Sequence, residues 1–78
     1  MQPSESAVAI CKIMVGLRIK SEETGMRDDV KNAFLGLGSE RSQQEFDGGV
    51  AYAVEQEWLS EDSNKLKLSR TGFVIGSN

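Results

Sequence analysis

The 78-residue sequence has no histidine, one cysteine and one proline. The lack of histidine removes the usual general base and the commonest zinc ligand. A lone Cys11 excludes an intramolecular disulfide and a multi-cysteine metal site. No nucleophile–base pair is visible, and nearby carboxylates such as Glu55 and Glu57 are common on solvated helices. We therefore predict that the chain is not an enzyme, has no catalytic residues and needs no metal or cofactor.

Long apolar stretches are also missing. No stretch approaches the roughly 18 consecutive apolar residues of a membrane-spanning helix, and residues 1–6 lack the basic and apolar segments of a secretory signal. These absences predict a soluble, cytoplasmic protein that does not contact a membrane. The composition, 38% hydrophobic and 27% charged, is ordinary for a globular protein. A chain this short supports one core, so we expect a single domain over residues 1–78.

The first helix is expected over residues 6–20, with Ser4 or Ser6 as its N-cap. Its apolar residues recur at steps of three and four: Ala7, Ile10, Cys11, Met14 and Leu17. Residues 13–20 also alternate as a strand would, and the helix is favoured because the run is longer than most strands. Further apolar residues lie off the stripe, so this helix needs cover on two sides. A second subunit would provide the second cover, which predicts a homodimer through this helix.

Two more helices are expected over residues 26–37 and 42–56. The first has the most regular apolar stripe in the chain, and Gly36 and Gly38 are expected to end it in a left-handed conformation. The second begins at Ser42 with a capping box, in which the serine hydroxyl accepts a hydrogen bond from the amide of Glu45. Its predicted buried stripe consists of Phe46, Gly49, Val50, Ala53 and Val54.

A hairpin is expected over residues 58–69. Residues 65–68 alternate charged and apolar side chains at period two, and residues 61–64 are typical of a turn. Residues 20–25 are polar and end in glycine, which indicates a connection. Residues 74–75 are expected to add a last strand or to pack as a tail, and residues 76–78 to fray.

Two motifs accompany this order of elements. Residues 46–59 end in Glu55-Gln56-Glu57-Trp58-Leu59, and residues 66–73 contain Leu68-Ser69-Arg70-Thr71-Gly72-Phe73. The first resembles the third helix and exit of small bacterial winged helix-turn-helix proteins, which commonly end in a Glu-Gln-Gly-Trp-Leu type sequence. The second is similar to their Leu-Thr-x-x-Gly phrase, which closes the wing. The resemblance covers residues 26–73 and implies an α+β, mainly helical fold, with three helices and a C-terminal two-stranded β-hairpin wing.

The sequence departs from that family at three places. Glu57 stands where a glycine usually ends the third helix, so either Glu57 takes a positive φ or the helix ends differently. The turn over residues 36–41 is longer and more polar than a tight helix-turn-helix corner. The chain also stops soon after the wing, which leaves no fourth helix for dimerisation.

The resemblance implies that the third helix enters the major groove of DNA while the wing contacts phosphates. We therefore expect a small DNA-binding protein that regulates transcription. Glutamine pairs with adenine in the groove, and basic side chains bind guanine or phosphate. The candidate DNA-contacting residues are Arg41, Gln43 and Gln44 at the groove and Lys65, Lys67 and Arg70 on the DNA backbone.

Charge favours a second hypothesis. Residues 42–60 have four acidic side chains and no Lys or Arg, although the whole chain has a net charge of only −3. An acidic third helix opposes the phosphate attraction that dominates DNA affinity. The alternative is a protein-interaction module whose third helix docks on a basic partner or on its own copy. Tyr52, expected to face outward, and Glu55 are its candidate interface residues, whereas Trp58 is expected to anchor the core.

Overall fold

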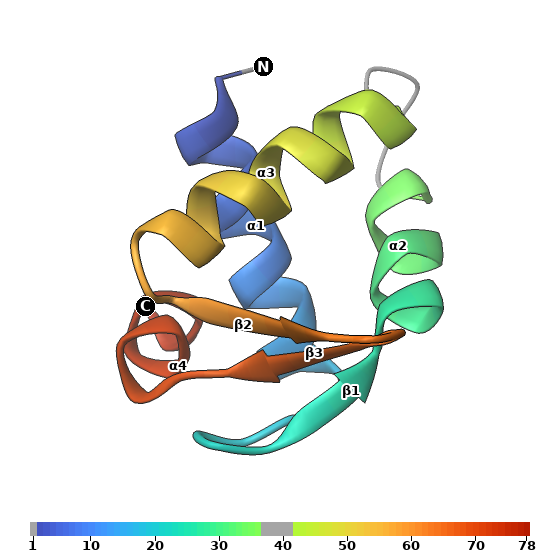
Figure 1. Ribbon diagram of the computed structural model, residues 1–78. Coiled ribbons are helices and arrows are strands. Elements are labelled where there is room, and N and C mark those ends of the chain that lie inside the picture. The colour runs from blue at the N-terminus through green and yellow to red at the C-terminus, as the bar shows by residue number, and fades with distance from the viewer. Residues whose placement is uncertain (1, 37–41) are drawn as a thin grey trace.

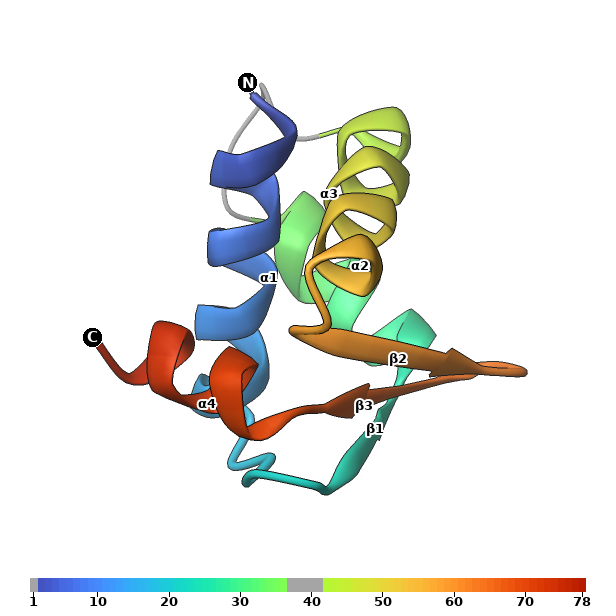
Figure 2. The same ribbon diagram turned by 60° about the vertical axis from the view of Figure 1, so that its left-hand side comes forward.

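The computed structural model describes residues 2–36 and 42–78, and these form an α+β fold that is mainly helical (Figure 1). The elements in chain order are α1 (Pro3–Gly16), β1 (Thr24–Met26), α2 (Arg27–Leu35), α3 (Gln43–Glu55), β2 (Leu59–Asp62), β3 (Lys65–Leu68) and α4 (Arg70–Ser77). The three N-terminal helices lie over one face of a small antiparallel sheet, and α4 lies at the end of the sheet beside α1 (Figures 1 and 2).

The sheet has the strand order β1-β3-β2, so β3 is its central strand. Thr24 of β1 lies opposite Lys67, and Leu59 of β2 lies opposite Leu68. The expected hairpin over residues 58–69 is confirmed, but the expectation that residues 20–25 are only a connection was wrong. A three-residue strand is too short to show a period-two pattern, and β1 is fixed by its pairing with β3 and by the contact of Gly25 with the side chain of Ile19.

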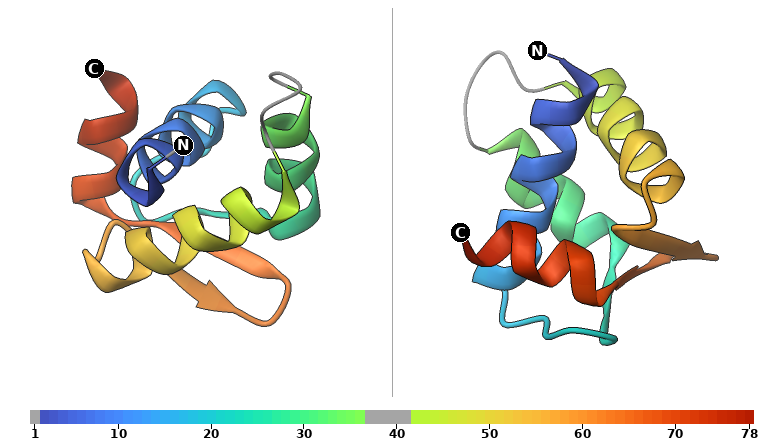
Figure 3. Two further views of the ribbon diagram at one scale, coloured as in Figure 1. Left: turned by 90° about the horizontal axis from the view of Figure 1, so that it is seen from above. Right: turned by 90° about the vertical axis from the view of Figure 1, so that its left-hand side faces the viewer.

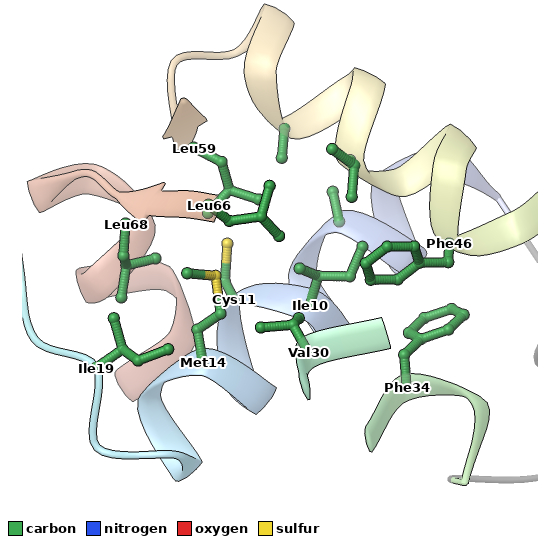
Figure 4. Close-up of a cluster of buried hydrophobic side chains, with 13 residues drawn as sticks. Ile10, Cys11, Met14, Ile19, Val30, Phe34, Phe46, Leu59, Leu66 and Leu68 are labelled. Carbon is green, nitrogen blue, oxygen red and sulfur yellow. The ribbon is translucent and has the colours of Figure 1, made fainter. Parts of the chain in front are cut away.

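The hydrophobic core lies between the three N-terminal helices and the inner face of the sheet (Figure 4). Its buried residues are Ala7, Ile10, Cys11, Met14, Ile19, Val30, Phe34, Phe46, Val50, Ala53, Leu59, Leu66 and Leu68. The rings of Phe34 and Phe46 have centroids 5.6 Å apart and join α2 to α3. Leu66 and Leu68 point inward from β3, as the alternating pattern predicts.

The first helix is confirmed, but its predicted bounds were wrong. It begins at Pro3, which suits the first helical position because proline has no N–H to satisfy there. Its N-cap is therefore Gln2, and Ser4 and Ser6 lie inside the helix. The helix ends at Gly16, because Arg18 adopts a φ of 66° and turns Ile19 back into the core.

The ends of α2 and α3 test three predictions. Gly36 has φ −77° and ψ −8°, so its predicted left-handed conformation was wrong, and Gly38 lies outside the described residues. The capping hydrogen bond at the start of α3 is confirmed, with Glu45 N donating to Ser42 Oγ at 3.2 Å. Val54, expected to be buried, is 38% exposed, because it lies at the edge of the helix face that contacts the core.

The sequence left two alternatives for the end of α3: a positive φ at Glu57 or a different helix end. The structure confirms the first, because Glu57 has a φ of 64°. This turn brings the chain back toward the helix, so that Trp58 N donates to Ala53 O at 2.8 Å. The side chain of Trp58 is half-buried against the core, at the junction between α3 and β2. The prediction of an anchoring Trp58 is thereby confirmed.

Helix α4 replaces the strand or frayed tail expected after the hairpin. Its N-cap is Ser69, whose hydroxyl accepts from Gly72 N at 3.1 Å and donates to Trp58 O at 2.8 Å. Gly76 lies directly against the backbone of Cys11, so α4 packs on α1 (Figure 3). The prediction that the chain leaves no fourth helix was wrong, and α4 provides cover for α1 that the sequence had suggested would come from a second subunit.

Candidate interaction surface on α3

The outward face of α3 is formed by residues at steps of four, three and four, namely Gln44, Gly48, Ala51 and Glu55. Three of them are exposed, and Gly48 is half-buried with no atom near the position that a Cβ would occupy. The opposite face packs on the core through Phe46, Gly49, Val50 and Ala53. This part of the sequence-derived helix orientation is confirmed. The outward face of α3 therefore has small residues at its centre, Gly48 and Ala51, and a carboxylate at its C-terminal end, on Glu55.

Tyr52 does not lie on this outward face as predicted. It is half-buried and contacts Trp58 edge-to-face, with ring centroids 5.6 Å apart. The left-handed turn at Glu57 explains the difference, because it returns the indole ring to the side of α3 on which Tyr52 lies. The phenol is therefore held beside the outward face by Trp58, next to Glu55 at the three-residue spacing of helix neighbours.

Arg27, the first residue of α2, has a role that the sequence did not reveal. Its Nη2 lies 3.0 Å from Asp47 Oδ1 on α3, and its Nε lies 4.0 Å from Glu61 Oε2 on β2. The guanidinium carbon is 5.2 Å from the centroid of the Phe46 ring, a cation–π distance. The guanidinium of Arg27 therefore connects α2 with α3 and with the hairpin. Its partners are distant in sequence, so no local motif signals them.

The lysines predicted to contact DNA lie on the outer face of β3 and are exposed. Lys65 is opposite Asp62 in the register of the sheet, and Lys67 Nζ lies 3.5 Å from Glu22 Oε2. Carboxylates from β2 and from the segment before β1 therefore accompany both lysines.

The other predicted DNA-contacting residues lie on two helices, apart from Arg41. Gln43 and Gln44 are exposed in the first turn of α3, as expected. Arg70 begins α4 and is not part of the hairpin, because Ser69 caps a helix at this point. Arg41 lies outside the described residues. Among the described candidates, two lysines therefore lie on β3, one arginine begins α4, and two glutamines lie at the start of α3.

An open hollow of about 360 Å³ lies between the first turns of α1 and α3. Its lining residues are Pro3, Ser6, Ser42, Gln44, Glu45 and Gly48. Two helix N-termini favour an anion here, but the carboxylate of Glu45 opposes one. The hydroxyl of Ser6 is inaccessible to solvent because Ser6 is packed against Gly49. The hollow therefore has no consistent preference for a charged ligand.

Within the described parts of the chain, no group of three or more His, Cys, Asp or Glu residues is placed to hold a metal ion. None of the helices formed by these same residues has the length and apolar character to span a membrane. Comparison with known proteins adds no relative, since no protein-family model, curated protein or solved structure matches the chain. The chemistry of its own surface is therefore the basis for a functional assignment.

Proposed function

We propose that this chain is a winged-helix protein-interaction domain that binds a basic protein through the outward face of α3. The order of its elements supports the winged-helix assignment, with α2 and α3 leading into a hairpin whose second strand pairs with β1. A fold of this kind serves both DNA binding and protein binding, so the charges at its surface must decide between them.

The observation that carries the proposal is the negative charge of α3 and of the residues that follow it directly. Residues 42–60 contain four acidic side chains and no Lys or Arg. The nearby Arg27 is already bound to Asp47 and lies beside Glu61. Glu55 and Glu57 are exposed, and neither has an ion-pair partner among residues 2–36 and 42–78. This face repels phosphate and attracts a cationic surface.

The aromatic pair beside Glu55 supports the same role. Tyr52 is half-buried against Trp58, so its ring is held in place before any partner arrives. A pre-positioned aromatic side chain loses little conformational entropy on binding, and tyrosine and tryptophan are enriched among the residues that dominate interface energies. Tyr52 and Glu55 together provide an aromatic and an anionic contact for a partner lysine or arginine.

A Lys- and Arg-rich peptide tests the proposal by fluorescence anisotropy. Wild-type protein is expected to bind it with an affinity that falls as salt rises, and Glu55→Lys is expected to weaken binding by about tenfold through charge repulsion. Asp28→Asn, on α2, is the control for loss of a carboxylate elsewhere. Equal binding by Glu55→Lys and wild type, or no peptide binding in low salt, would contradict the proposal.

DNA binding, as in a transcriptional regulator, is the second candidate function. It is favoured by one observation, the exposure of Gln43 and Gln44 in the first turn of α3, where glutamine amides can reach base edges. A labelled duplex is the appropriate probe. DNA binding requires an affinity that falls steeply with salt and that decreases when Lys65 and Lys67 are both replaced by Ala. The four carboxylates and the lack of Lys and Arg in residues 42–60 lead us to expect no such binding.

A further inference from the structure

We propose, resting on the proposed protein-binding function, that α3 recognises an arginine of its partner and that Tyr52 makes α3 prefer arginine to lysine. The guanidinium stacks on the ring of Tyr52 and donates hydrogen bonds to the carboxylate of Glu55. The aliphatic part of the arginine side chain lies across Gly48. We call these three residues of α3 the arginine site.

The ring of Tyr52 has a fixed orientation and is not stacked flat on Trp58. The two rings are inclined by 67°, with centroids 5.6 Å apart. Such an edge-to-face contact occupies at most one face of either ring, and Tyr52 is only half-buried. The phenol therefore offers an aromatic surface on which a planar group can stack.

The helix neighbours of Tyr52 provide a carboxylate on one side and open space on the other. Glu55 follows Tyr52 by three residues and Gly48 precedes it by four, the two spacings that make helix residues neighbours. Side chains on a helix point toward its N-terminus, so the Glu55 carboxylate extends toward the turn of Tyr52. No atom of the described chain lies within 4 Å of the position that a Cβ of Gly48 would occupy. A long side chain can thus pass over Gly48 and place its charged end beside both the ring and the carboxylate.

The fold already contains one arginine bound in this way. The guanidinium carbon of Arg27 is 5.2 Å from the centroid of the Phe46 ring, and its Nη2 is 3.0 Å from Asp47 Oδ1. That ring and that carboxylate both belong to α3. Tyr52 and Glu55 present the same two groups, and Glu55 forms no ion pair with any residue in 2–36 or 42–78.

The chemistry of the two basic side chains favours arginine at this site. A guanidinium is planar and weakly hydrated, so it can stack on a ring while its N–H groups bind a carboxylate. The lysine ammonium is a compact and strongly hydrated charge, which gains mainly from the negative potential of α3. We therefore expect an arginine peptide to bind about fivefold more tightly than a lysine peptide of otherwise identical sequence.

Two peptides that differ only in having arginine or lysine at every basic position test the proposal by fluorescence anisotropy. Wild type is expected to prefer the arginine peptide. Tyr52→Leu is expected to bind both peptides equally, because stacking is lost while the charge of Glu55 remains. Tyr52→Phe is expected to retain the preference, since it keeps the ring.

Gly48→Leu tests the site without replacing either member of the Tyr52–Trp58 pair. Its side chain fills the space over which the arginine passes, so the preference for arginine is expected to disappear. Arg70→Ala is the control for charge alone. Arg70 follows Ser69, whose hydroxyl donates to Trp58 O, and its removal is expected to strengthen the binding of both peptides by the same factor.

Equal binding of the two peptides by wild type would overturn the arginine site, and so would a preference for arginine that persists in Tyr52→Leu or in Gly48→Leu. If Tyr52→Leu does not fold, Gly48→Leu decides alone. In each of these cases peptide binding by wild type leaves the proposed function standing. A wild type that binds neither peptide in low salt would overturn both proposals.

Discussion

Gly49 of α3 lies in direct contact with Ser6 of α1, because a Cβ atom on Gly49 would be 2.7 Å from the Cβ of Ser6. The same Cβ would be 2.9 Å from Ile10 Cδ1. Neither distance leaves room for a methyl group. The crossing of α1 and α3, and thus the position of the outward face of α3, depends on the glycine at this point.

Gly49→Ala is therefore expected to lower the free energy of unfolding by about 1–3 kcal/mol, the usual cost of overpacking. Gly48→Ala is the matched control, since no atom lies within 4 Å of the Cβ that it adds. That control is expected to raise the free energy of unfolding by about 0.5–1 kcal/mol, because alanine is the better helix former. Urea unfolding of both variants measures the difference, and effects of equal sign would contradict the close contact.

The packing of α4 on α1 gives a second prediction. A Cβ on Gly76 would lie 2.7 Å from the carbonyl carbon of Cys11 and 2.7 Å from Val15 Cγ2, so Gly76→Ala is expected to push α4 away from α1. Local opening should then expose Cys11 more often, and we expect its reaction with a thiol reagent to become about tenfold faster. Gly16→Ala is the control, because its added Cβ meets no atom within 4 Å. Equal rates in both variants would show that α4 does not protect Cys11.

Much of the fold could be predicted because its longer elements have periodic patterns. The stripe of α3 identifies Phe46, Gly49, Val50 and Ala53 as its buried face, and the alternation in β3 identifies Leu66 and Leu68. Cys11 is buried, as its place in the stripe of α1 predicts. The burial of these side chains can be predicted because the spacing of apolar residues within one helix or strand is visible in the sequence.

Helix α4 and strand β1 could not be predicted because neither depends on a periodic pattern. α4 has two glycines in eight residues, a composition that disfavours an isolated helix. Both glycines instead permit close packing, with Gly72 against the carbonyl oxygen of Trp58 and Gly76 against the backbone of Cys11. Tertiary contact outweighs intrinsic propensity here.

The candidate site was predicted only in part for a similar reason. The exposure of Gln44 and Glu55 follows from helix geometry, and the structure confirms it. The ion-pair partners of the charged side chains cannot be predicted from helix geometry. Arg27 pairs with Asp47, 20 residues away in sequence, and Lys67 pairs with Glu22, which lies in the segment before β1. The predicted outward position of Tyr52 was wrong because the turn at Glu57 brings Trp58 against the Tyr52 ring, and the sequence does not show this turn.

The positive φ of 64° at Glu57 predicts the effect of a glycine there. A left-handed conformation costs a residue with a Cβ roughly 1–2 kcal/mol, and part of the gain from glycine is offset by its greater freedom in the unfolded chain. We expect Glu57→Gly to be more stable than Glu57→Ala by up to about 1 kcal/mol. Both variants lose the same carboxylate, so their difference in urea unfolding isolates the backbone effect. A more stable alanine variant would contradict it.

The buried thiol of Cys11 predicts how stability changes at alkaline pH. Burial raises the pKa of Cys11 from 9.0 to about 11, because desolvation disfavours the thiolate. Below pH 9 the thiol is protonated in the folded and the unfolded chain, so stability from this group is fully present. Between pH 9 and about 11 the unfolded chain releases the proton first, which lowers the free energy of unfolding as pH rises.

Cys11→Ala removes this titration and is the variant that tests it. The alanine variant is expected to be less stable at neutral pH because it leaves a small cavity, but its stability should fall less between pH 9 and 11 than that of wild type. All other ionisable groups are present in both proteins, so their contributions cancel in the comparison. Urea unfolding at several pH values measures both curves, and parallel curves would show that the Cys11 thiol ionises as easily in the folded chain as in the unfolded one.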